Sequence, residues 1–172
     1  MRGRERRLTH LVGSKDRFAL ELGERSGGLR RVDVWLAGQH LTCDDDMAYV
    51  PQLLESLRSD RAGLDSVNRL PPPFPGLPPE AAHRRLQAED GERREQWWFL
   101  RWGPTTDNVV TYLFRDGERL VITAEFWRDE HLQRHPEHAG AVFAAEIPAE
   151  ELATVLQDAA AALGQRWSSS DG

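Results

Sequence analysis

The stretch that decides the fold is residues 108–127, NVVTYLFRDGERLVITAEFW. Two runs within it, at 109–115 and 119–127, follow the period of two that is typical of half-buried strands. Between the runs stand Asp116 and Gly117, a pair that accepts the positive φ angles of a tight turn. The stretch therefore predicts a β-hairpin with two antiparallel strands.

The residues on both sides of this hairpin extend the predicted sheet. After it, residues 140–148, GAVFAAEIP, predict a last strand that leads directly into a helix over 148–164. Before it, residues 96–102, QWWFLRW, are apolar on both faces and predict a central strand. The apolar stripe of the C-terminal helix consists of Leu152, Val155, Leu156, Ala159 and Leu163.

The N-terminal half contains a second predicted hairpin, followed by a shorter helix. Residues 17–23, RFALELG, and 30–38, RRVDVWLAG, both alternate with a period of two, and 38–43 predict a short third strand. Three aspartates at 44–46 then stand where capping oxygens and negative charge favour the start of a helix. The apolar residues of that helix, at helical spacing, are Val50, Leu53, Leu54 and Leu57.

These elements predict an α+β fold: a single antiparallel sheet of about six strands, with the C-terminal helix packed on one face. We expect a basic, flexible N-terminus over 1–16, one domain over 17–165 and a frayed tail over 166–172. Residues 68–80, NRLPPPFPGLPPE, hold six of the ten prolines and predict an irregular connector within the domain. Two helical turns should follow the connector, and then an exposed loop over 88–95.

Charge and composition narrow the possible partners. The chain has 172 residues and a net charge of −6, whereas residues 1–7 carry four arginines and one glutamate, a charge of +3. The remainder therefore carries −9, which argues against nucleic-acid binding and fits a basic protein partner, or simple solubility, better. No run approaches the roughly 18 apolar residues of a membrane span, and Cys43, the single cysteine, permits no internal disulfide. We expect a cytoplasmic protein.

The histidines suggest a metal site. His131, His135 and His138 have spacings of four and three, and three imidazoles can bind zinc. However, Pro136 interrupts any helix there, and the polar neighbours are typical of a solvated loop. Cys43 is a poor nucleophile because the neighbouring acidic residues raise a thiol pKa. Motifs for nucleotide binding, serine hydrolysis or zinc peptidase chemistry are absent, so no cofactor is expected and a non-catalytic role is favoured.

Two groups of side chains are candidates for contact with a partner. The strand at 96–102 has large rings on both faces, and the C-terminal helix can cover only one of them. The other face needs the first helix, the proline-rich connector or another protein. Polar loops on a rigid sheet, such as the turn at 105–108, are where binding residues concentrate. The partner-binding candidates are Trp97, Trp98, Trp102, Asp44, Asp45 and Asp107.

Three segments carry a resemblance to known proteins. FALELGERSGGLRRVDVWLAGQHLT, TTDNVVTYLFRDGERLVITAEFW and VFAAEIPAEELATVL resemble conserved bacterial proteins of unknown function. The first of them also resembles the opening of small immunity proteins that neutralise polymorphic toxins. The leading hypothesis is thus a non-catalytic, immunity-like inhibitor of a bacterial toxin. The alternatives are a metal-dependent enzyme that uses the histidines and a small-molecule-binding regulator with an aromatic pocket.

Overall fold

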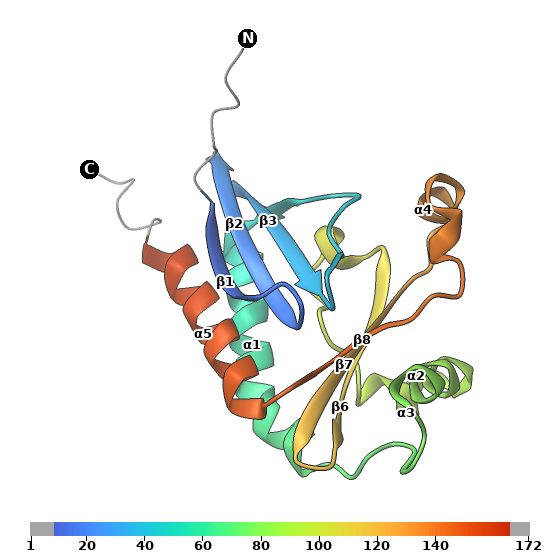
Figure 1. Ribbon diagram of the computed structural model, residues 1–172. Coiled ribbons are helices and arrows are strands. Elements are labelled where there is room, and N and C mark those ends of the chain that lie inside the picture. Colours follow the sequence, from blue (N-terminus) through green and yellow to red (C-terminus); the bar gives the residue numbers. More distant parts are fainter. Residues whose placement is uncertain (1–8, 166–172) are drawn as a thin grey trace.

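A computed structural model describes residues 9–165 (Figure 1). The expectations for residues 1–8 and for the tail 166–172 lie outside the described residues. Strand β1 (His10–Ser14) occupies part of the segment for which the sequence predicts a flexible N-terminus. It pairs antiparallel with the next strand, in a register that sets Val12 opposite Leu20. The main-chain hydrogen bonds of this pairing order a segment that lacks a strong apolar pattern of its own.

The predicted N-terminal hairpin is present and forms the centre of the first sheet. Strand β2 (Phe18–Ser26) pairs antiparallel with β3 (Leu29–Leu36). Two short strands, β4 (Gln39–His40) and β5 (Met47–Tyr49), both pair with β3. The inward side chains of the hairpin are almost completely buried: Phe18, Leu20, Leu22, Val32, Val34 and Leu36.

The hairpin predicted over residues 108–127 belongs to the second sheet. Strands β6 (Val109–Asp116) and β7 (Arg119–Phe126) pair antiparallel around a turn in which Gly117 has a φ of 63°. Strand β8 (Phe143–Ile147) pairs with the other edge of β7. The α+β class with antiparallel strands is therefore confirmed, but the expectation of one sheet is wrong because the two hairpins belong to separate sheets.

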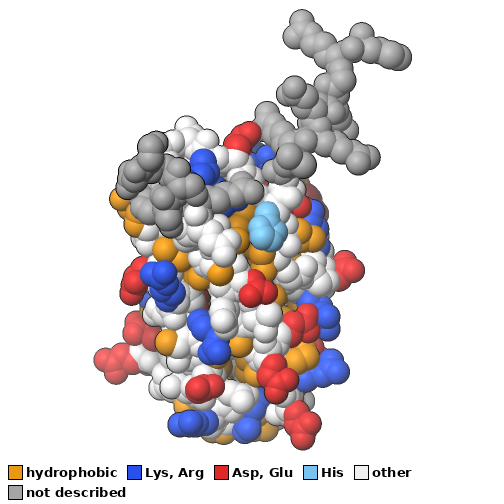
Figure 2. Space-filling model, turned by 90° about the vertical axis from the view of Figure 1, so that its left-hand side faces the viewer, with side chains coloured by type: hydrophobic (Ala, Val, Ile, Leu, Met, Phe, Trp, Pro, Cys, Tyr) orange, Lys and Arg blue, Asp and Glu red, His pale blue; other side chains and the backbone are white. Residues whose placement is uncertain are grey.

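Two long helices and one shared core hold the sheets together. Helix α1 (Val50–Arg69) and the predicted C-terminal helix α5 (Ala149–Gln165) lie side by side (Figure 1). The main hydrophobic cluster contains residues of both sheets and of both helices, among them Leu20, Leu57, Ile122 and Leu156. Figure 2 shows the side on which α5 lies, where acidic and basic side chains are interspersed with small hydrophobic areas.

A helix covers the outer face of the second sheet. It is α2 (Pro79–Ala88), where the sequence predicts two helical turns. The short helix α3 (Gly91–Glu95), which has no buried residue, follows it where the sequence predicts a loop. A second hydrophobic cluster joins α2 to this face through Ala82, Leu86, Tyr112 and Val121. Phe74 and Leu77 of the connector pack against the same cluster. The chain itself therefore covers this face of the sheet.

Residues 96–102 do not form the predicted central strand. Trp98 makes an isolated bridge to Tyr112, and two main-chain hydrogen bonds join this segment to β6. Leu100 then takes a φ of 57°, a left-handed conformation that a strand cannot contain, and the chain turns away from β6. The aromatic run is thus divided, with Trp97 against the α2 side and Trp102 in the main core.

The aspartates at 44–46 do not cap α1. Strand β5 lies between them and the helix, whose N-cap is Tyr49 and has no side-chain capping bond. Asp46 instead pairs with Arg31 of β3 at 3.4 Å, and Asp45 accepts a hydrogen bond from the Met47 main-chain nitrogen at 3.1 Å. The capping prediction fails because the chain after Asp46 first pairs with β3.

Asp60 of α1 accepts a hydrogen bond of 2.6 Å from the indole nitrogen of Trp102. Burial raises the pKa of Asp60 to about 6, and the bond from Trp102 reduces this shift only in part. A raised pKa means that the neutral carboxyl stabilises the fold, and this contribution is lost as the pH rises through the folded-state pKa. At neutral pH the charged form of Asp60 therefore opposes folding.

We predict that Asp60→Asn raises the free energy of unfolding by about 1–3 kcal/mol at pH 7. The gain should disappear below about pH 3, where Asp60 is largely protonated in both the folded and the unfolded chain. Chemical denaturation at the two pH values measures it, with Asp65→Asn at an exposed position of α1 as the matched control. A variant less stable than the parent at pH 7 would show that the charged carboxylate supports the fold.

Candidate functional site

The candidate site lies where a loop of the first sheet meets the start of β6. The side-chain amide of Asn108 is buried there. Its nitrogen donates to the Leu41 carbonyl oxygen at 2.9 Å and to Asp44 Oδ2 at 2.7 Å. These two bonds hold the loop after β4 against the second sheet.

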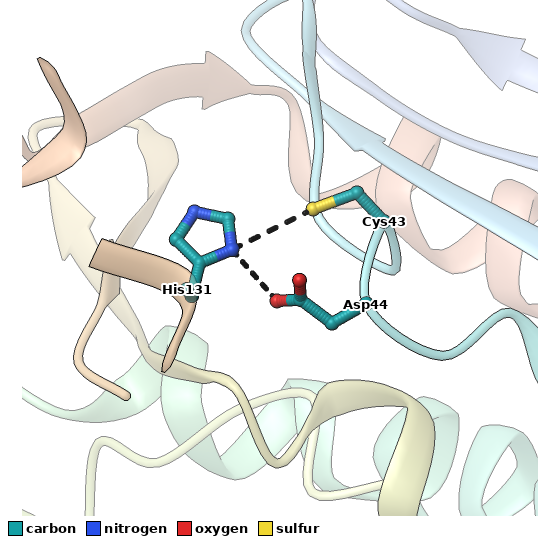
Figure 3. Close-up of side chains that lie close together, drawn as sticks. All are labelled: Cys43, Asp44 and His131. Carbon is teal, nitrogen blue, oxygen red and sulfur yellow. Dashed lines mark hydrogen bonds and ion pairs between the residues drawn. The ribbon is translucent and has the colours of Figure 1, made fainter. Parts of the chain in front are cut away.

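Asp44 and His131 form the centre of this junction (Figure 3). His131, from the short helix α4 (Asp129–Arg134), is 1% exposed, and its Nδ1 lies 2.7 Å from Asp44 Oδ2. Arg134 donates to the other carboxylate oxygen at 2.8 Å. Burial alone would raise the pKa of Asp44, but the hydrogen bonds from Asn108 and His131 and the positive charge of Arg134 outweigh it and lower the pKa. Asp44 is therefore a carboxylate with a fixed orientation.

The three predicted histidines do lie close together. His131 Nε2 is 2.8 Å from Nδ1 of His138, which belongs to the turn η2 (Pro136–His138). The rings of His131 and His138 both lie nearly parallel to the Phe126 ring, at centroid distances of 3.9 and 4.9 Å. The His135 ring lies 4.8 Å from that of His131. The chain thus brings the three rings together, and two of them lie against the Phe126 ring.

The nitrogen atoms of these histidines are divided between two donor groups. Within residues 9–165, His131 groups with Cys43 and Asp44, whereas His135 and His138 group with Glu137. Both nitrogens of His131 already have hydrogen-bond partners, Asp44 and His138. Metal binding by the histidine trio stays a prediction, and the geometry provides two alternative donor sets.

Cys43 lies at the same junction, with Sγ 3.9 Å from His131 Nδ1. Burial and the negative charge of Asp44 raise the pKa of the thiol to about 11, so the thiol is protonated at neutral pH. A nucleophilic triad also needs the thiol and the carboxylate on opposite nitrogens of the imidazole, whereas here both face Nδ1. The arrangement does not activate Cys43 as a nucleophile.

The predicted tryptophans are largely inaccessible. Trp97 and Trp102 are 6% and 3% exposed, so a partner cannot reach them in this structure, and their proposed role in partner binding is not supported. Trp98 is half-buried, with the Arg101 guanidinium 4.0 Å from its ring centre. Large aromatic side chains are commonly buried in the core, and Trp97 and Trp102 are core residues in this structure.

Sequence reasoning missed Trp127, which is 52% exposed. Its indole nitrogen donates to the Asp107 carbonyl oxygen at 2.8 Å, which fixes the ring beside the loop at 104–108. The alternation of the preceding strand could have predicted this exposure. Successive side chains point to opposite faces, so the side chain that follows the buried Phe126 points away from the core.

Three exposed acidic residues lie beside Trp127, and we call this surface the acidic rim: Asp107, Asp129 and Glu130. Arg128 also lies there, 3.7 Å from Asp107. A hollow of about 440 Å³ adjoins the rim, and its lining includes Trp98, Thr111 and Trp127. Asp107, predicted from the sequence, thus belongs to this surface, whereas Asp44 is turned toward His131. Asp45 is exposed in the loop after β4, where it accepts the bond from the Met47 main-chain nitrogen.

Comparison with known proteins identifies the fold. No protein-family model matches the sequence, and no curated protein matches it either. The structure is similar to that of CdiI from Burkholderia dolosa AUO158, with a TM-score of 0.60 and 12% sequence identity over 89% of this chain and 99% of that chain. The two chains share a fold. CdiI is an immunity protein, so the likeness of the N-terminal hairpin to immunity proteins is confirmed at the level of the fold. In the described part of the chain, every helix is too short or too polar to span a membrane.

We predict that Asp44→Asn lowers the free energy of unfolding by about 1–2 kcal/mol at pH 7, because the charged hydrogen bonds to His131 and Arg134 weaken. A lowered pKa gives stability that is present above the unfolded-state value and lost as the pH falls through the folded-state value. The difference from the parent should therefore disappear in acid, as measured by urea denaturation. Asp45→Asn is the matched control, and an equal loss in both variants would refute a special role for Asp44.

Proposed function

We propose that this chain is a non-catalytic, immunity-like inhibitor that binds a protein toxin through the acidic rim. The observation that carries the proposal is Trp127, a large ring that is held in place and half-exposed, with the acidic residues Asp107, Asp129 and Glu130 beside it. Tryptophan is enriched among the residues that dominate binding energy at protein interfaces. The acidic side chains around it favour a basic partner and would accelerate its association.

The fold supports this proposal. CdiI is an immunity protein of a contact-dependent inhibition toxin system, and its chain matches this one over nearly its whole length. Different functions can share one fold, so the similarity supports the class of function and does not identify a partner. An immunity protein of this kind would act in the cytoplasm, where it would meet its toxin.

The chemistry of the site also supports a binding role. The acidic rim consists of loop and helix-end residues placed on a sheet, which is the usual position of binding residues. Cys43 is protonated and shares one imidazole nitrogen with Asp44. Inhibition of a toxin requires a complementary surface rather than reacting groups. A basic toxin that contacts Trp127 would bury this ring and neutralise the carboxylates around it.

We predict that Trp127→Ala weakens binding to the cognate toxin about 30-fold or more, as expected for a residue worth at least about 2 kcal/mol. The probe is the product of the gene beside the one that encodes this chain, tested by calorimetry. Glu130→Gln should reduce the association rate and its dependence on salt, because this residue lies at the edge of the surface.

Leu11→Ala is the control for Trp127, since Leu11 is also an exposed apolar residue, and Glu55→Gln is the control for Glu130. If Leu11→Ala weakens binding as much as Trp127→Ala does, the acidic rim is not the interface. If the neighbouring gene encodes no toxin and no protein co-purifies with this chain, the immunity function itself is wrong.

A further inference from the structure

Three different metal-ligating groups converge at the junction between the sheets. Cys43 Sγ, an Asp44 carboxylate oxygen and His131 Nδ1 all lie within 4.8 Å of one another. Cys43 and Asp44 come from the loop after β4, whereas His131 comes from α4, so folding alone brings the set together (Figure 3). Thiolate, imidazole and carboxylate are the three side-chain ligands that zinc takes in proteins.

The surroundings of this donor set orient two of its members. Asn108 and Arg134 hold the Asp44 carboxylate, and Nε2 of His131 is 2.8 Å from His138 Nδ1. Supporting hydrogen bonds of this kind fix ligand orientation at metal sites, and their loss typically costs 10–100-fold in affinity. The His131 ring is also held flat against Phe126. Little rearrangement would be needed before an ion binds.

We propose that Cys43, Asp44 and His131 bind one zinc ion, with a fourth position open to water. Calcium and magnesium do not fit this set, because both prefer ligands that are all oxygen. Cys43 is exposed, which gives the ion a path from solvent. The site does not use the rim residues around Trp127 and is independent of the proposed inhibition.

Zinc binding at this site requires a defined set of proton movements at His131, His138 and Cys43. The carboxylate of Asp44 can only accept, so the proton of His131 resides on Nδ1, and Nε2 accepts from His138 Nδ1. When zinc takes Nδ1, that proton leaves to solvent and Nε2 takes the proton of His138 Nδ1. His138 regains a proton from solvent on Nε2, and its Nδ1 becomes the acceptor. The histidines therefore release no net proton, and the thiol of Cys43 releases one.

The test uses the full chain without an affinity tag, with a reductant that contains no thiol. Titration with zinc should show one site with a dissociation constant of about 1 μM or lower, and one proton released per ion at pH 7, measured in buffers of different ionisation enthalpy. Cobalt should give the absorption band of a thiolate–cobalt bond. Cys43→Ser, at an exposed position, should abolish that band and weaken zinc binding at least about 10-fold.

The control variant is His135→Asn, which alters the neighbouring donor group of His135, Glu137 and His138. We expect the cobalt band and the zinc affinity to be unchanged in this variant. His138→Asn should weaken zinc binding while the thiolate band remains, because His138 only orients His131. Two results would overturn the proposal: no thiolate band in the parent protein, or binding that survives Cys43→Ser and is lost in His135→Asn.

Discussion

The candidate site depends on Asn108, whose side chain and main chain join the loop of the first sheet to the segment at Trp127. Its side-chain nitrogen donates to the Leu41 carbonyl oxygen and to Asp44, in the loop of the first sheet, and its main-chain carbonyl oxygen accepts a bond from the Trp127 main-chain nitrogen at 3.3 Å. A buried amide that lost these partners would leave polar groups unpaired, which costs about 1–3 kcal/mol for each. This single residue thus fixes both the position of Asp44 and the start of the loop that carries the acidic rim.

Local patterns were sufficient for most of the fold. The alternation in 108–127 and the stripe from Leu152 to Leu163 each depend on neighbours in the sequence, and the structure contains the predicted hairpin and helix. The number of sheets depends on pairing between distant strands, about which periodicity carries no information. The run at 96–102 would have joined the hairpins into one sheet, but the left-handed φ of Leu100 ends its pairing with β6.

The candidate site was harder to predict for the same reason. His131 and Asp44 are 87 residues apart, and no local pattern relates a loop of one sheet to a helix beside the other. The spacing of the histidines in 131–138 suggested a common site, and their rings do lie close together, but nothing in it indicated that His131 would turn toward Asp44. The exposure of Trp127 could have been predicted from its place after Phe126. Trp97 and Trp102 were candidates for partner binding because the sequence does not show which elements bury them.

The position of α5 also determines how this chain can fold during synthesis. Its apolar stripe completes the core of both sheets, and it is the last element of the described chain. The two hairpins and α1 can form earlier, but the part of the core that α5 covers stays open until α5 has left the ribosome. Translation must therefore pass residue 165 before the core closes, and until then the nascent chain exposes strand faces that a chaperone could bind.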